Sequence, residues 1–430
     1  MIIEMIEGKR EDLVALSAKL GMREKMEIAG VAGAVSRILE EVKRDGDEAV
    51  SRFTAEFDKV SLDPINFRVS EEEIESSFDL VDEDLVRVMK SAFENIMEFH
   101  TAQISGDVFL EKGNGSYVKL INRAIATAGI YVPGGTAPLP SSVLMNICPA
   151  KAAGVRKIVM CTPPRKDGSV EPSILAAARI AGADEIYRIG GAQAIAAMAY
   201  GTKSIPAADK ICGPGNIYVN TAKRLVYGTV DIDMFAGPSE ILIIADETAV
   251  PEYLAADLLS QAEHDKLASA VLITTSRRIA QETAEITAQT AERMPRHEIL
   301  EASLRDYCSI VLVPDLETAA DFANELAPEH LELCVEDPQE LLKQITNAGA
   351  VFLGNYSPES LGDYLAGPNH VLPTSGTARF FSPLNTGDFI KKMSVISYSK
   401  EALAACAGDI AVFARAEKLE CHARAAEIRR

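Results

Sequence analysis

The residues most suited to chemistry are histidines that stand beside carboxylates or amides. Glu329 and His330 lie where an expected helix meets an apolar strand, and we expect that place to be the mouth of a parallel sheet, where ligands commonly bind. A neutral histidine can take a proton near pH 7, and an adjacent carboxylate can activate water. A helix C-terminus with a dipole-compensating histidine would have the same sequence, and spacing alone does not decide between the two interpretations.

Two further pairs could bind a divalent metal through amide, carboxylate and imidazole groups. Gln261 and His264 are three residues apart near the end of an apolar helical segment, so they share one helix face. Asp363 and His370 lie in a long segment rich in glycine and proline, and such segments are usually functional or disordered. A polar helix terminus is the more common reason for a Gln-His pair at this spacing, so that motif alone is weak.

Three glycine-rich segments lie at expected element ends: the first two follow an expected strand, and the third opens a helix. They are Tyr131-Val132-Pro133-Gly134-Gly135, Gly190-Gly191-Ala192-Gln193 and Gly213-Pro214-Gly215-Asn216. Each could present backbone N–H groups to a phosphate, although a tight turn explains any one of them equally well and none is the GxGxxG fingerprint. Together they would line one edge of one sheet, which favours a ligand site.

The elements that must position these residues follow an alternating pattern. Charged helical segments come first, at residues 34–57 and 71–99. The β-rich runs that follow are 124–132, 157–161, 185–189, 240–245, 270–275, 310–313, 331–335 and 350–353. Helical segments between them are 141–153, 173–180, 192–199, 251–264, 278–293, 316–326 and 338–347. Such alternation predicts parallel sheets with helices on both faces.

We therefore expect an α/β protein with two parallel-sheet, incomplete Rossmann-like domains and helical N- and C-terminal extensions, because the strands are too many for one sheet. The break is expected at Ala236-Gly237-Pro238-Ser239. The expected parts are a largely helical region 1–120 that partly packs on the second α/β domain, a first α/β domain 121–238, a second α/β domain 239–380, and a helical tail 381–430. Left-handed helix stops are expected at Gly154, Gly182 and Gly349.

The composition is that of an ordinary globular enzyme. The chain has 430 residues, 47% of them hydrophobic, and a net charge of −20. An acidic surface repels phosphate backbones, so no nucleic-acid partner is expected. No apolar run has the length of a membrane span, and the N-terminus does not resemble a signal peptide. Scattered cysteines without CxxC spacing fit a cytoplasmic protein.

Taken together, these segments resemble the histidinol dehydrogenase family. The ordered matches are YVPGG at 131–135, GGAQAIAA at 190–197, GPGN at 213–216, AGPSE at 236–240, DLLSQAEH at 257–264, PEHL at 328–331, GDY at 362–364 and NHVLPT at 369–374. So many co-linear matches make a chance resemblance improbable. The sequence departs from the family pattern at Lys266-Leu267, where a smaller or turn-forming residue is expected, and this concerns the loop rather than a ligand.

The resemblance implies a zinc-dependent, NAD-linked dehydrogenase that oxidises L-histidinol to L-histidine through histidinaldehyde, the last steps of histidine biosynthesis. It implies one zinc per subunit, bound by Gln261, His264, Asp363 and His422. Substrate contacts are implied at these ligands and at Ser239, His330, His370 and Glu417, and NAD contacts at Tyr131, Gln193 and Asn216. Family members are homodimers, so Glu417 and His422 would act in the partner's active site.

Within this expectation zinc holds the substrate's imidazole and amine, while protein groups move the protons. His330 is the general base, and Glu329 activates the water that adds to the aldehyde. Cys148 could offer a thiohemiacetal route, but it has no adjacent base or cation and is expected to be packed and inert. The alternatives are a zinc hydrolase in which Glu329 activates water, and a metal-binding α/β scaffold without catalysis.

Overall fold

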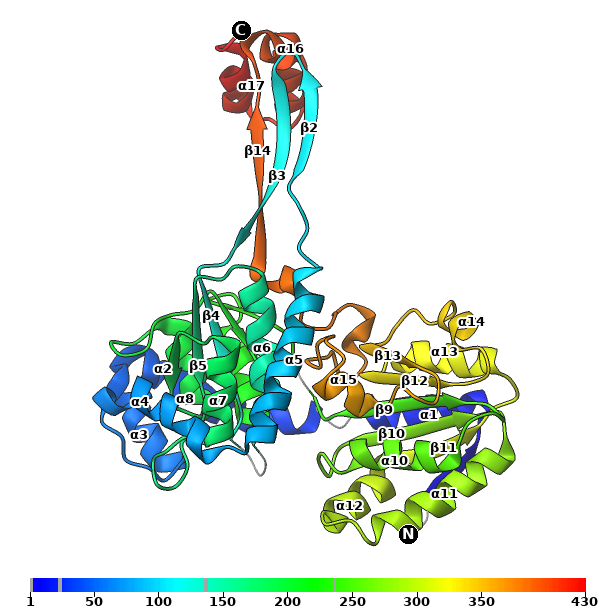
Figure 1. Ribbon diagram of the computed structural model, residues 1–430. Coiled ribbons are helices and arrows are strands. Elements are labelled where there is room, and N and C mark those ends of the chain that lie inside the picture. The colour runs from blue at the N-terminus through cyan, green and yellow to red at the C-terminus, as the bar shows by residue number, and fades with distance from the viewer. Residues whose placement is uncertain (1–2, 22–24, 135–137, 236) are drawn as a thin grey trace.

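The computed structural model describes residues 3–21, 25–134, 138–235 and 237–430. Figure 1 shows two α/β lobes side by side and a narrow arm that rises from the first lobe and carries the C-terminus at its tip. The expected α/β class with parallel sheets is confirmed. Ala236, at the expected break, and Gly135, in the first glycine motif, lie outside the described residues.

The first lobe is built on a five-stranded parallel sheet of order β6-β5-β4-β7-β8. Because helices cover both faces, its longer strands are continuous apolar runs. The strands are β4 (Thr127–Tyr131), β5 (Lys157–Cys161), β6 (Glu185–Tyr187), β7 (Lys210–Cys212) and β8 (Asp231–Ile232). β4 lies between β5 and β7. The chain leads from β4 to β5 on one side and from β7 to β8 on the other, so a crevice forms beside the carboxyl ends of β4 and β7.

Helices from two parts of the chain cover this sheet. One face carries α4 (Glu71–Ser76), α5 (Glu83–Thr101), α6 (Pro140–Ala152) and α7 (Pro172–Ala181). The other face carries α2 (Lys25–Asp45), α3 (Asp47–Phe57), α8 (Gly191–Tyr200) and α9 (Ile217–Val226). The N-terminal helices therefore complete the core of the first lobe.

The second lobe contains a six-stranded parallel sheet of order β1-β11-β10-β9-β12-β13. Its strands are β1 (Glu4–Glu7), β9 (Glu240–Ala245), β10 (Ser269–Thr274), β11 (Cys308–Leu312), β12 (His330–Cys334) and β13 (Ala350–Leu353). One face packs on α10 (Pro251–Ala262), α11 (Arg277–Ala291) and α12 (His297–Tyr307). The other packs on α1 (Arg10–Gly21), α13 (Leu316–Leu326) and α14 (Pro338–Leu342), and α15 (Glu359–Tyr364) follows β13.

The arm is an antiparallel sheet with helices at its tip (Figure 1). It consists of β2 (Val108–Gly113), β3 (Ser116–Ala124), β14 (Ile390–Ser397), α16 (Lys400–Ala416) and α17 (Glu420–Glu427). Besides the expected helices, the regions before residue 120 and after residue 380 contain the strands β1, β2, β3 and β14, which were not expected from the sequence. β1 and β2 are short or exposed and have no strong periodicity. Gly113, Asn114 and Gly115 have positive φ angles in the turn between β2 and β3, and this Gly-Asn-Gly sequence is a hairpin signal that the predictions from the sequence did not use.

The expected glycine stops are correct at two positions and wrong at the third. Gly154 and Gly182 have φ angles of 84° and 85° after α6 and α7. Gly349 is not left-handed; a Cβ there would lie 2.5 Å from the carbonyl oxygen of Glu329. Glycine is needed at this position because two backbones approach closely. Among the described helices, none combines the length and apolar character needed to cross a membrane.

A buried ion pair fixes the turn that follows β7. Lys223 and Asp233 are each 1% exposed and contact each other. The Lys223 ammonium donates to the Gly213 carbonyl at 2.9 Å, and Asp233 Oδ2 accepts from the Gly213 N–H at 2.8 Å. Gly213 has a φ of 121°, and a Cβ there would stand 2.0 Å from the carbonyl oxygen of Tyr131. Only glycine fits this turn.

Gly213→Ala should therefore lower the free energy of unfolding by more than about 3 kcal/mol, because backbone strain and a steric clash act together. Gly228→Ala is the matched control, since Gly228 has a φ of 96° but nothing within 4 Å of the place that an added Cβ would take. It should lose only about 1–2 kcal/mol. Urea unfolding of both variants measures the difference, and equal losses would show that the contact with Tyr131 does not constrain the turn.

Candidate active site

Glu329 and His330 lie at the amino end of the second sheet. α13 ends at Leu326, Ala327 takes a φ of 50°, and β12 begins at His330. The pair therefore lies at an end of a parallel sheet, but at the amino end and not at the carboxyl end, beside which parallel sheets commonly bind ligands. The chain reaches it from a helix before entering a parallel strand, so the site is built from the starts of β9 and β12.

The backbone of Glu240, the first residue of β9, holds both members of the pair. Its N–H donates to Glu329 Oε2 at 2.8 Å, and its carbonyl oxygen accepts from His330 Nδ1 at 3.0 Å. Glu329 and His330 are 7% and 4% exposed, and Oε2 of the one lies 3.7 Å from Nδ1 of the other. The backbone of a neighbouring strand, rather than a mutual hydrogen bond, fixes their positions.

The contact with Glu240 determines where His330 carries its proton. A carbonyl oxygen only accepts, so the proton of the neutral ring lies on Nδ1 and the lone pair lies on Nε2. Nε2 has no hydrogen-bond partner in the described part of the chain, and carboxylate oxygens of Glu359 and Asp363 lie 4.0 and 3.9 Å away. Burial lowers the pKa of His330, which keeps the ring neutral. This geometry suits a general base.

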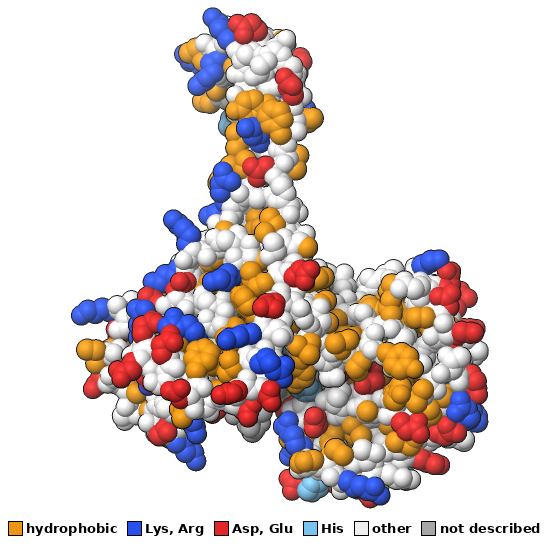
Figure 2. Space-filling model, in the orientation of Figure 1, with side chains coloured by type: hydrophobic (Ala, Val, Ile, Leu, Met, Phe, Trp, Pro, Cys, Tyr) orange, Lys and Arg blue, Asp and Glu red, His pale blue; other side chains and the backbone are white. Residues whose placement is uncertain are grey.

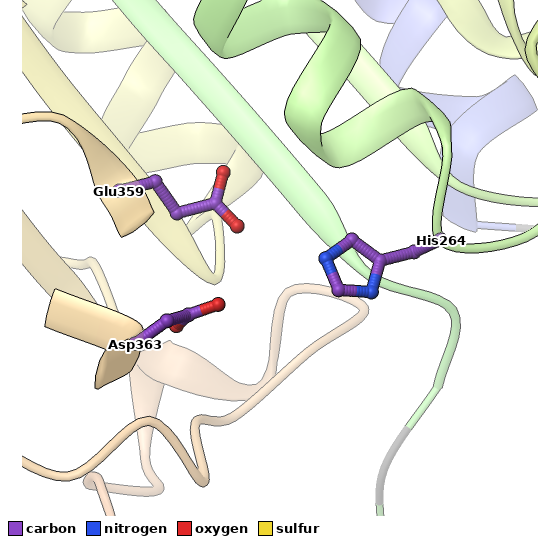
Figure 3. Close-up of side chains that lie close together, drawn as sticks. All are labelled: His264, Glu359 and Asp363. Atoms are coloured by element: carbon purple, nitrogen blue, oxygen red, sulfur yellow. The ribbon is translucent and has the colours of Figure 1, made fainter. Parts of the chain in front are cut away.

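Three side chains beside His330 form a cluster of metal-binding type. Figure 3 shows His264, Glu359 and Asp363 pointing toward one another, and one ligand atom from each lies within 4.8 Å of the others. His264 follows α10, whereas both carboxylates come from α15. Sequence reasoning missed Glu359, although its four-residue spacing from Asp363 on one helix face was an available signal. Burial raises the pKa of Glu359 well above its usual range.

The amide of Gln261 lies beside this cluster. Gln261 is fully buried at the end of α10. In the amide orientation that satisfies both ends, its nitrogen donates to Glu359 Oε2 at 3.0 Å and its oxygen accepts from the Glu240 N–H at 2.6 Å. Nitrogen and oxygen donors without sulfur suit zinc, manganese or cobalt. The residues present thus fit a divalent metal.

A cavity of about 180 Å³ opens over these groups between the lobes, and we call it the cleft. Ser142 and Gly213 line it from the first lobe, Ser239 and His330 line it from the second, and His370 lines it from the segment after α15. The Nδ1 atom of His370 lies 3.1 Å from the carbonyl oxygen of Asp363, and its Nε2 lies 3.5 Å from Ser142 Oγ. The carboxyl end of the first sheet therefore faces the amino end of the second across the cleft.

Tyr131, Gln193 and Asn216 line a second cavity, of about 560 Å³, in the first lobe. Tyr131 ends β4, Gln193 lies in the first turn of α8, and Asn216 caps α9, so all three lie on the carboxyl side of the first sheet. This is the side where parallel sheets commonly bind ligands. We call this space the first-lobe cavity.

Two N–H groups of the glycine-rich segments already have partners within the protein and so are not available to a phosphate. The Gly191 N–H donates to Tyr131 Oη at 3.1 Å, and the Gly213 N–H donates to Asp233. For these two glycines the tight-turn interpretation holds.

The remaining candidates lie outside the cleft. Glu417 follows α16 and His422 lies in α17, and both are exposed at the tip of the arm, away from the other candidates of this chain (Figure 1). Cys148 is fully buried in α6, and burial raises its pKa to about 12, in agreement with an unreactive thiol.

Fold and site define a class: a two-lobed α/β enzyme with a buried neutral histidine, a cluster of metal-binding type and a separate cavity at the switch point of a parallel sheet. The family model for histidinol dehydrogenase matches residues 22–430. The chain is 53% identical over 396 residues to histidinol dehydrogenase of Bacillus subtilis (strain 168), covering 92% of each, and 51% identical over 428 residues to that of Moorella thermoacetica, covering 100% of each. A crystal structure of histidinol dehydrogenase from Elizabethkingia anophelis matches with a TM-score of 0.89 and 41% identity, over 93% of this chain and 92% of that one. The chain belongs to the histidinol dehydrogenase family.

Proposed function

We propose that this protein oxidises L-histidinol to L-histidine through histidinaldehyde, in two NAD-dependent steps that complete histidine biosynthesis. The observation that carries the proposal is the unpartnered Nε2 of a buried, neutral His330, beside a metal-binding cluster and facing the cleft. Family membership supplies the substrate, whose imidazole, amine and primary alcohol suit such a site. NAD, when bound, supplies the hydride acceptor for each step.

The proposed zinc ligands are Gln261, His264 and Asp363, together with His422 of the partner subunit. A bound zinc ion would hold the substrate's imidazole and amine nitrogens and so orient its alcohol carbon. Glu359 adds a carboxylate that the family resemblance did not assign, and its place in the cluster suits either direct binding or support of the ligands.

His330 serves as the base in both steps. Its Nε2 takes the alcohol proton as the hydride leaves, and Nδ1–H remains on the Glu240 carbonyl, which stabilises the charged ring. Glu329 then activates the water that adds to the aldehyde carbon, and its carboxylate is held for this by the Glu240 N–H. His330 releases its first proton to solvent and then accepts the second proton when the hydrated aldehyde is oxidised.

NAD binding is assigned to the first-lobe cavity, with Tyr131, Gln193 and Asn216 as contacts. All three line one continuous space, which supports their common role. We also propose a cytoplasmic location, which the free, mostly buried cysteines support.

We further propose a homodimer in which the arm reaches the partner's cleft. Figure 2 shows hydrophobic side chains along the arm and at its tip. Phe109, Ile396 and Phe413, which belong to β2, β14 and α16 of the arm, are 57%, 73% and 72% exposed. Exposed apolar groups on a projecting arm favour a protein partner. The arrangement would deliver Glu417 and His422 to the substrate, because this chain holds them away from its own cleft.

Histidinol and NAD together should yield reduced nicotinamide, with two equivalents formed for each histidine. A chelator should abolish the reaction and added zinc should restore it, because the substrate loses its anchor when the metal is removed. Absorbance at the nicotinamide band with product analysis measures both. Zinc binding without reduced nicotinamide would favour the hydrolase or the inert scaffold instead.

Glu329→Gln should slow oxidation of supplied histidinaldehyde roughly 100- to 10,000-fold and affect alcohol oxidation less, since water enters only in the second step. His330→Asn should damage both steps. Single-turnover measurements from each starting compound separate them. Normal aldehyde oxidation by the Glu329→Gln variant would rule out its role in activating water.

Heterodimers of a His422→Ala subunit and a His330→Asn subunit should regain about half of the wild-type activity per dimer, because one of two shared sites is then intact. Each variant homodimer should be inactive. Tagged subunits allow the heterodimer to be purified before assay. Absence of recovery in verified heterodimers would contradict sharing of the site.

A further inference from the structure

The first-lobe cavity contains a carboxylate that the proposed function does not use. Asp58 follows α3, is half-buried, and lines the cavity. Its Oδ2 accepts from Gln193 Nε2 at 3.3 Å. Burial raises the pKa of Asp58 to about 6, so it is ionised at neutral pH. Arg37 also lines the cavity, but it is 60% exposed and its guanidinium lies 3.9 Å from Glu41.

A second acceptor stands beside this carboxylate. Gln193 is fully buried, and its Oε1 has no hydrogen-bond partner among the described residues. A buried acceptor without a donor is costly, so a ligand that supplies one would be bound favourably. Two adjacent acceptors are complementary to a pair of hydroxyl groups, and an anion at this place would be repelled.

The position of the cavity indicates which half of a dinucleotide meets Asp58. Gly213 lines the cleft, and Asn216, three residues later, lines the first-lobe cavity, so the turn between them separates the two spaces. The nicotinamide must reach His330 in the cleft. Arg37 lies in α2 and Asp58 follows α3, and these helices pack on the outer face of α8 and α9. The adenosine half of the dinucleotide would therefore lie at this end of the first-lobe cavity.

We propose that Asp58 and Gln193 accept hydrogen bonds from the adenosine ribose hydroxyls and that Asp58 makes the enzyme selective for NAD over NADP. The inference rests on the proposed function. A 2′-phosphate removes one donor and places about two negative charges against the carboxylate. An acidic residue has the same effect on ribose recognition in dinucleotide-binding folds generally.

Asp58→Asn tests the proposal with little change of shape. The ratio of kcat/KM for NAD to that for NADP should fall at least roughly 10-fold, because one charge-assisted hydrogen bond and one repulsion are lost. The change should lie in the KM values, with kcat at saturating NAD unaltered. Glu56→Gln is the matched control: it removes the same charge from an exposed position on α3 and should leave the ratio unchanged.

Calorimetric titration with ADP-ribose and with its 2′-phosphate separates this proposal from the proposed function, because it needs no turnover. Wild-type protein should prefer ADP-ribose, and Asp58→Asn should lose most of that preference. An unchanged preference, or a fall in kcat with both cofactors at a constant ratio, overturns the role of Asp58 even if histidinol is oxidised. Preserved selectivity of binding without histidinol oxidation would instead contradict the proposed function alone.

Discussion

The backbone of Glu240 makes the contacts on which the site depends. Through its N–H and carbonyl it orients a carboxylate and an imidazole that follow it by about ninety residues in the chain. β9 and β12 must pair in one register for this to occur, with His330 opposite Ile241. On the other side, Gly349 allows the start of β13 to approach Glu329, and the Ala350 N–H donates to the Glu329 carbonyl at 2.9 Å.

The two sheets present opposite ends to the cleft. Parallel sheets usually bind ligands beyond their carboxyl ends, and the first-lobe cavity lies at that end of the first sheet. The second sheet has its amino ends at the cleft. Gln261 lies at the C-terminus of α10, and Glu329 follows the C-terminus of α13. The turn from Gly213 to Asn216 lies between the two spaces, and the Lys223–Asp233 pair holds it.

Buried acids accumulate behind the cleft. Burial raises the pKa of Glu332 and Glu359 well above their usual range and that of Asp257 to about 6. Glu332 accepts from the Glu359 N–H at 3.0 Å and so joins the sheet to α15. Several carboxylates in a dry region cannot all be ionised without a cation. The same electrostatics that disfavour the charged cluster would favour a divalent metal within it.

The sequence by itself determined the alternation of strands and helices, because apolar runs and helical spacing are local patterns. It also gave candidate site residues from residue type and short spacing, namely Glu329, His330, Gln261, His264 and Asp363. It left open whether the Glu-His pair was catalytic or part of a helix terminus, because both would have the same local sequence.

Only the tertiary structure decided which of these residues meet and what surrounds them. The contacts of Glu240 with His330 and of Asp58 with Gln193 join residues 90 and 135 positions apart, and no local periodicity encodes such pairs. Glu359 belongs to the cluster because α15 is held against β12, where the Glu359 N–H donates to Glu332. Burial, which keeps His330 neutral and leaves its Nε2 without a partner, arises only when distant segments exclude water together.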